Sequence, residues 1–87
     1  MRKTYKVALQ LLFNGEEKPG THTCCTHSLN TLYSWFRETV PEGWEYRLSM
    51  SGEALKAFGG YRSVDGTGYI PLKHKLVGRL RVMHLLD

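Results

Sequence analysis

The first residues of the chain alternate between hydrophobic and polar positions, a pattern that predicts a β-strand. In TYKVALQLLF, residues 4–13, every second residue from Tyr5 onward is apolar, while Lys6 and Gln10 lie between these positions. Side chains two residues apart share one face of a strand, so the segment has an apolar face that can be buried. The following NGEEKPG, residues 14–20, is rich in turn formers and predicts a hairpin connection.

A second strand followed by a helix is predicted after this loop. THTCCTH, residues 21–27, contains β-branched threonine and shows no helical period. From Ser28 the apolar residues recur at spacings typical of one helical stripe: Leu29, Leu32, Tyr33, Phe36 and Val40. Ser28 is a suitable N-cap. Pro41 disfavours helical geometry in the residue before it, so we expect the helix to end at Val40.

The second half of the chain predicts further strands and one short helix. WEYRLSM at 44–50 alternates and predicts a strand. SGEALKAFGG at 51–60 begins with a capping serine and ends with a glycine pair, which favours a short helix. YRSVDGTGYI at 61–70 predicts a hairpin with a type I′ turn at Asp65–Gly66. LVGRLRVMHLL at 76–86 predicts a last strand.

These elements together predict an α+β fold. The expected order is β-β-α-β-α-β-β-β, in a small and mainly antiparallel sheet with one principal helix packed on one face and a second short helix. An isolated helix of about 13 residues is marginal in water, so its apolar stripe must lie on the sheet. The chain has 87 residues, 41% of them hydrophobic, and we expect one compact domain over residues 1–87. No stretch of the sequence approaches the roughly 18 apolar residues of a membrane span, so we expect no membrane contact.

The formal net charge of +4 is unevenly distributed. Acidic residues are absent between Gly66 and Leu86, where the sequence has four basic ones: Lys73, Lys75, Arg79 and Arg81. Their odd-numbered positions place them on one side of an extended chain. The preceding hairpin adds Arg62 and Tyr69 beside this stripe. Three interpretations are open: contact with an acidic protein surface, contact with RNA or DNA, or a solvated face that protects an edge strand.

Two cysteines and two histidines within residues 22–27 are the candidate metal ligands: His22, Cys24, Cys25 and His27. Structural zinc takes four tetrahedral ligands of these types, commonly with a spacer between paired cysteines. Neighbouring side chains of a strand point to opposite faces, so Cys24 would share a face with His22, and Cys25 with His27. One ion could not reach all four. We therefore expect a structural strand that binds no metal, with a zinc-stabilised domain as an alternative.

Nothing in the sequence predicts catalysis. Cys25 and His27 could lie near each other, but no acid or amide that would orient the histidine is evident beside them. The glycines form no phosphate-binding motif. We therefore expect a protein that is not an enzyme, has no catalytic residues and needs no cofactor. Since two adjacent cysteines cannot form a disulfide framework, we also expect a reducing, cytoplasmic location.

Residues 2–50 resemble small bacteriophage proteins that inhibit host machinery. The predicted hairpin leads into a helix opened by HSLNTL, and the chain re-enters the sheet through a turn formed by Val40, Pro41, Gly43, Trp44 and Glu45. This β-β-α-β arrangement is similar to that of short phage inhibitors of bacterial RNA polymerase, and anti-CRISPR proteins share the same style of small α+β domain. The resemblance is in a structural turn, and residues 51–87 depart from the pattern, so no binding residue is transferred.

The resemblance implies a phage- or mobile-element-type inhibitor that covers a surface of a host protein or nucleoprotein complex, such as RNA polymerase or a CRISPR effector, in the bacterial cytoplasm. The basic C-terminal tract, and not the resemblance, predicts a partner with an acidic surface, and the candidate contacts are Lys73, Lys75, Arg79, Arg81, Arg62 and Tyr69. The alternative is a nucleic-acid-binding domain that uses the C-terminal Lys/Arg face. An unpaired edge at the first or last strand could support a homodimer.

Overall fold

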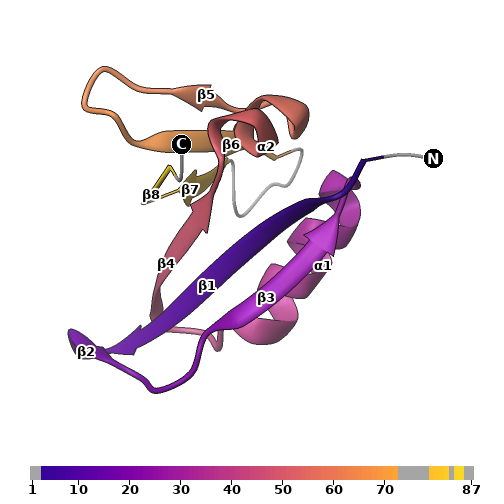
Figure 1. The fold of residues 1–87 in the computed structure, drawn as a ribbon. Coiled ribbons are helices and arrows are strands. Elements are labelled where there is room, and N and C mark those ends of the chain that lie inside the picture. The colour runs from indigo at the N-terminus through magenta and orange to yellow at the C-terminus, as the bar shows by residue number, and fades with distance from the viewer. Residues whose placement is uncertain (1–2, 73–78, 83, 86–87) are drawn as a thin grey trace.

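The described part of the chain forms two sheets and two helices (Figure 1). This is a computed structural model, and it describes residues 3–72, 79–82 and 84–85. The larger sheet contains β1 (Tyr5–Phe13), β2 (Glu16–Glu17), β3 (His22–Thr26), β4 (Glu45–Met50) and β8 (His84–Leu85). The smaller sheet contains β5 (Tyr61–Arg62), β6 (Gly68–Pro71) and β7 (Arg79–Val82). With the helices α1 (Leu29–Thr39) and α2 (Gly52–Ala57), this confirms the predicted α+β class.

β1 is the central strand of the larger sheet. It pairs antiparallel with β4 along one edge and with β2 and β3 along the other, so that Leu9 lies between His22 and Leu48. β8 adds to the free edge of β4 in the parallel direction. The sheet is therefore mainly antiparallel, as the alternating pattern predicts, with one parallel pairing at its edge.

A two-residue turn at Asn14–Gly15 connects β1 to β2. Both residues have positive φ, 52° for Asn14 and 80° for Gly15, and Phe13 pairs directly with Glu16. Positive φ at both central residues is the requirement of a type I′ turn, whose twist matches that of the flanking strands. The predicted hairpin connection is thus shorter than residues 14–20, because a short second strand begins within it.

α1 lies against one face of the larger sheet, behind β1 and β3 in Figure 1. Its N-cap is Ser28, whose Oγ accepts a hydrogen bond from the backbone N–H of Thr31 at 3.3 Å. The chain leaves helical geometry at Val40, where φ is −97° and ψ is 109°, directly before Pro41. Both predicted helix ends are confirmed. Leu32 is fully buried, and the other stripe residues pack partly buried against the same core.

The hairpin between β5 and β6 has a wider turn than the sequence predicts. Of Asp65 and Gly66, only the glycine has positive φ, at 89°. The backbone N–H of Gly66 donates to the carbonyl of Ser63 at 3.0 Å, and that of Ser63 donates to the carbonyl of Thr67 at 2.8 Å. The type I′ prediction at Asp65–Gly66 is therefore wrong. The Asp65 carboxylate instead accepts a hydrogen bond from the backbone N–H of Thr67, which fixes the turn without positive φ at Asp65.

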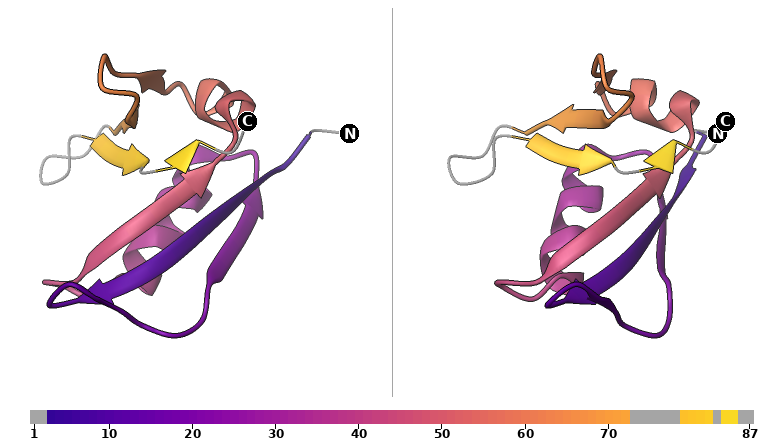
Figure 2. Two further views of the ribbon diagram at one scale, coloured as in Figure 1. Left: turned by 60° about the vertical axis from the view of Figure 1, so that its left-hand side comes forward. Right: turned by 90° about the vertical axis from the view of Figure 1, so that its left-hand side faces the viewer.

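The predicted last strand is divided between the two sheets. β7 pairs antiparallel with β6, whereas β8 pairs with β4, and Figure 2 shows these two yellow strands following each other from one sheet to the other. The C-terminal segment thereby joins the sheets. The two sheets and both helices share one core, formed by the buried residues Val7, Leu9, Leu32, Leu48, Met50, Ala54, Leu55, Phe58, Ile70, Leu80 and Val82.

Candidate binding surface on the smaller sheet

The outer face of the smaller sheet presents two tyrosines and two arginines, Tyr61, Tyr69, Arg79 and Arg81, which we call the tyrosine–arginine face. The alternation of β7 produces it, because Leu80 and Val82 are fully buried while Arg79 and Arg81 are exposed. Tyr69 pairs across the sheet with Tyr61 on one side and Arg81 on the other. Residues in one cross-strand row point to the same face, so these side chains lie together.

Arg79 stacks on an aromatic ring in this face. Its guanidinium carbon lies 4.3 Å from the centroid of the Tyr69 ring, and its Nη1 is 3.5 Å from Tyr61 Oη, a weak hydrogen bond. The rings of Tyr61 and Tyr69 are adjacent, with centroids 5.8 Å apart. A cation held over a ring face keeps its full charge, while its planar donors stay directed along the fork of the guanidinium. The stack therefore positions Arg79 without neutralising it.

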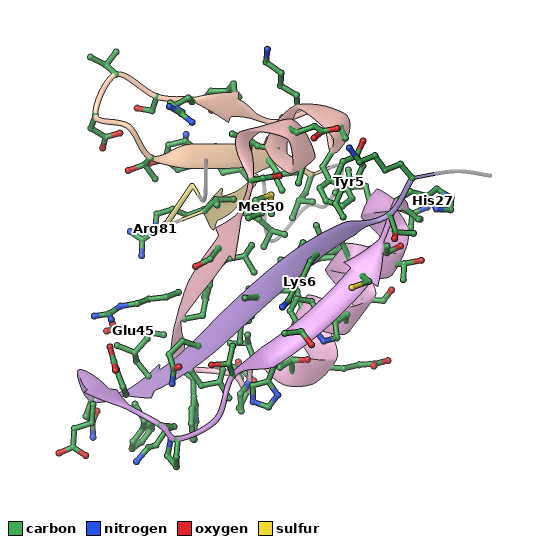
Figure 3. All side chains as sticks on the ribbon, viewed as in Figure 1. Tyr5, Lys6, His27, Glu45, Met50 and Arg81 are labelled. Atoms are coloured by element: carbon green, nitrogen blue, oxygen red, sulfur yellow. The ribbon has the colours of Figure 1, made fainter. Side chains whose placement is uncertain are left out.

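Arg81 connects this face to the larger sheet. Its backbone N–H donates to Tyr46 Oη of β4 at 3.3 Å. The Tyr46 ring meets the ring of Phe36 in α1 edge to face, with centroids 4.7 Å apart. The side chain of Arg81 extends away from both sheets (Figure 3). The backbone of the face is thus anchored on α1 and β4, while the charged group points to solvent.

Neither Arg79 nor Arg81 forms an ion pair with a carboxylate in the described part of the chain. The two ion pairs found there join Lys3 to Glu53 and Arg47 to Glu17. Among the described residues, this arginine pair is therefore a local excess of positive charge, which attracts anionic groups.

The six residues predicted to contact a partner do not all lie on one surface. Tyr69, Arg79 and Arg81 come together in one face. Arg62 pairs with Gly68, one position out of step with the Tyr61–Tyr69 row, and it lines a hollow beside α2. Lys73 and Lys75 lie outside the described residues.

The cysteine–histidine segment forms the extended strand that the sequence predicts, β3. Cys24 pairs with the buried Val7 and is partly buried, whereas Cys25 pairs with the exposed Lys6 and is exposed. Burial, and to a smaller extent the neighbouring Cys25, raises the pKa of the Cys24 thiol. Within residues 3–72, 79–82 and 84–85, no group of three or more His, Cys, Asp or Glu side chains is placed to hold a metal ion. His22, Cys24, Cys25 and His27 are not brought together.

Two features of this region have no counterpart in the sequence-based predictions. One is the contact of Tyr46 with the backbone of Arg81, which joins residues 35 positions apart. The other is the hollow between α2 and β5, lined in part by Lys56 and Arg62. The first depends on how the two sheets are arranged, and the second on how the chain turns between α2 and β5. Local periodicity contains no signal for either arrangement.

Within the described residues, no helix has the length and apolar character needed to cross a bilayer. Comparison of the chain with models of protein families, with curated protein sequences and with solved structures found no match in any of the three.

Proposed function

We propose that this protein binds an acidic surface of a larger protein or nucleoprotein complex through the tyrosine–arginine face, and that it acts by covering this surface. The main support is the stack of Arg79 on Tyr69 beside the exposed Arg81, with no described carboxylate paired to either arginine. These groups project from paired strands on a buried core. A rigid sheet loses little conformational freedom on binding, so their contacts contribute efficiently to affinity.

The residue types suit a protein partner. Arginine and tyrosine are enriched among the residues that dominate the energy of protein–protein interfaces. A guanidinium can donate two parallel hydrogen bonds to one carboxylate, and Arg79 is held by Tyr69 in a position from which it can do so. Tyr61 is 47% exposed and offers a large apolar surface beside the charge.

Binding of single-stranded nucleic acid is the alternative function. The contacts of the Tyr69 ring with its neighbours favour it less than binding of a protein. Bases stack on aromatic rings whose faces are free. The Tyr69 ring instead has Arg79 over it and Tyr61 beside it. Phosphate contacts by Arg79 and Arg81 are compatible with the geometry, so RNA or DNA stays an outcome of the test below.

The biological role that we infer is inhibition of host machinery, in the manner of the small phage proteins that residues 2–50 resemble. The support for it is the β-β-α-β arrangement of β1, β3, α1 and β4 together with a binding face on the remaining part of the chain. In this proposal the protein is non-enzymatic, needs no cofactor and acts in the cytoplasm of a bacterial host, against a target such as RNA polymerase or a CRISPR effector.

The test is affinity capture from bacterial lysate, with and without nuclease, using three versions of the protein. The double variant Arg79→Glu/Arg81→Glu reverses both charges of the face. Lys6→Glu is the matched control, because Lys6 is exposed on the open side of the larger sheet. We expect the wild type and Lys6→Glu to retain the same nuclease-resistant partner. We expect the double variant to bind it at least about 100-fold more weakly, as measured by titration with the purified partner.

Two results would contradict the proposal. Equal binding by the double variant would show that the face is not used. Loss of the captured complex on nuclease treatment, with binding to short RNA or DNA that weakens steeply with salt, would instead support the nucleic-acid alternative.

A further inference from the structure

β3 lies at an edge of the larger sheet, and its outer side is unpaired within the described residues. Its inner side pairs with β1 over five residues, from the pair Tyr5–Thr26 to the pair Leu9–His22. The sequence alone suggests an open edge at the first or last strand. The expectation for the first strand is wrong, because β1 is paired on both sides and the open edge belongs to β3. Alternate residues of β3 direct their backbone N–H and C=O groups outward, away from β1.

β3 lacks the features that protect the other edges of the two sheets. Proteins prevent pairing at an edge by making the strand short, by placing charged residues or proline on it, or by a β-bulge. β3 has five residues, none of them Asp, Glu, Lys, Arg or Pro, and it pairs with β1 in an unbroken register. By contrast, the described strands β2, β5 and β8 have two residues each. β7 and the part of β4 that β8 does not cover carry charged residues: Arg79, Arg81, Glu45 and Arg47.

The surroundings of β3 leave its outer side accessible. The left view of Figure 2 shows β3 at the margin of the molecule, with α1 on one face of the sheet. Thr23 and Cys25 are exposed on the open face, and Cys24 is partly buried on the face that α1 covers. Threonine fits a pleated strand well, so another strand can be added here without unfavourable side-chain contacts. The backbone of β3 is thus a template for one more strand.

A second copy of the chain fits this edge. Two identical strands that pair antiparallel are related by a twofold axis, so residues at equal distances from the axis lie opposite each other. With the axis at Cys24, Thr23 lies opposite Cys25 of the second copy, and no like charges meet. The same arrangement of β7 would place Arg79 opposite Arg81 of the second copy, which is unfavourable. The charge pattern therefore permits self-pairing at β3 and opposes it at β7.

We propose that the protein forms a homodimer through antiparallel pairing of β3 with β3 of a second copy. The two larger sheets then form one continuous sheet, with both copies of α1 on the same side of it. The assembly is closed, because each copy uses its β3 edge once.

The proposed dimer leaves the tyrosine–arginine face uncovered. β1 separates β3 from β4, and β4 is the strand that contacts the smaller sheet through Tyr46 and Arg81. The inference goes beyond the proposed function and does not require it. If both are correct, one dimer presents two binding faces and binds more tightly to a target with repeated acidic sites.

The experiment is sedimentation velocity of the full chain under reducing conditions, from about 1 µM to about 1 mM. A short strand pair buries a small area, so we expect a dimer Kd of about 1–100 µM. The mass should rise from the chain mass of 10.0 kDa at low concentration to twice that value at high concentration. Amide hydrogen exchange is measured at both ends of this range. We expect outward-directed amides of β3 to exchange more slowly at high concentration.

The variant Thr23→Glu/Cys25→Glu tests the edge. Within one copy, position 25 lies beside Lys6, which a carboxylate complements, and position 23 lies beside Ala8. With the axis at Cys24 or at either neighbouring residue, carboxylates of the two copies face each other, so the Kd should rise at least about tenfold. Thr23→Lys is measured alongside as a second edge variant, and dispersion of the amide spectra shows whether each variant is folded.

The matched control is Lys56→Ala/Val64→Glu, which changes the net charge by the same amount at exposed positions away from β3 and should leave the Kd unchanged. Three results would overturn the inference: a monomer at every concentration, dimerisation of both edge variants as strong as that of the wild type, or equal weakening by the control. If the wild type is monomeric and the β3 amides are protected only in the captured complex, a strand of another protein occupies the edge, and the homodimer is rejected.

Discussion

Arginine side chains have different contacts in the two sheets. In the larger sheet, Arg47 of β4 is paired with the carboxylate of Glu17 in β2. In the smaller sheet, Arg79 is stacked on Tyr69. A carboxylate neutralises a guanidinium and occupies its donors, whereas an aromatic ring positions the group and leaves its charge available. The same residue type thus forms an ion pair within the larger sheet and, in the smaller sheet, stacks on a ring that does not neutralise its charge.

This difference in surface does not extend to the interior. β4 supplies Leu48 and Met50 to the core, and the smaller sheet supplies Ile70, Leu80 and Val82 to the same cluster. The parallel pairing of β8 with β4 adds a backbone connection. We therefore expect the two sheets to unfold together, even though the arginines on their surfaces have different contacts.

The largest effect is expected from Leu48→Ala, which tests this shared core. Leu48 has no exposed surface, and the truncation should lower the free energy of unfolding by about 2–5 kcal/mol. Urea unfolding is followed by tryptophan fluorescence, which reports on Trp35 and Trp44, and by the NMR signals of Tyr69. If the sheets form one cooperative unit, both probes shift to the same lower midpoint.

The control for this prediction is Val64→Ala. Val64 is fully exposed in the turn between β5 and β6, so its truncation should change stability by less than about 0.5 kcal/mol. Separate midpoints for the tryptophan and Tyr69 signals would show that the smaller sheet unfolds on its own. The two sheets would then be independent folding units.

A smaller effect is expected from Gly60→Ala, which disturbs only the contact between α2 and the smaller sheet. The added Cβ would overlap Leu55 and the Tyr69 carbonyl, and we expect a loss of about 1–3 kcal/mol. Gly59→Ala is the matched control, since its Cβ meets open space and the cost is the positive φ of 79°, about 1 kcal/mol. Thermal unfolding of both variants measures the difference. A Gly60→Ala protein as stable as the wild type would contradict the close packing that forms the hollow.

The sequence predicts the larger sheet better than the smaller one, and the reason is the range of the interactions. β1, β3, α1 and β4 follow from local alternation, the helical stripe, the Ser28 cap and Pro41. The smaller sheet depends on pairings between distant segments. Local patterns do not show that the last strand divides between two sheets, because both halves have the same alternation.

The residue types in the two turns explain why the type I′ turn forms at Asn14–Gly15 and not, as predicted, at Asp65–Gly66. Asparagine adopts positive φ more readily than most residues, so Asn14–Gly15 forms the tight turn. Asp65 is satisfied instead by the N–H of Thr67, which lowers the pKa of its carboxyl group. This wider turn sets the pairing of Tyr61 with Tyr69, and it therefore decides that Arg62 is not in the tyrosine–arginine face.

Part of the candidate site can be predicted from the sequence. The alternation of side chains along a strand predicts that Arg79 and Arg81 lie on the same face, and the predicted hairpin places Tyr69 near them. The identity of the stacked ring and the role of Tyr46 depend on strand register and on contacts between the sheets. Both are set by the whole fold, and no short stretch of sequence contains them.

The smallest effect is a difference in reactivity between the two faces of the larger sheet, measured at Cys24 and Cys25. Cys24 points to the covered side, and burial raises the pKa of its thiol, so less thiolate is present at any pH below that value. Cys25 is exposed. With the neutral reagent iodoacetamide near pH 8, we expect Cys25 to be alkylated several-fold faster, as resolved by tandem mass spectrometry of the tryptic peptide that contains both. The ratio should fall as the pH rises and Cys24 ionises. Equal rates at pH 8, or faster alkylation of Cys24, would mean that β3 does not have one covered and one open side. The contrast between the larger sheet, which α1 covers on one side, and the exposed tyrosine–arginine face of the smaller sheet would then no longer hold.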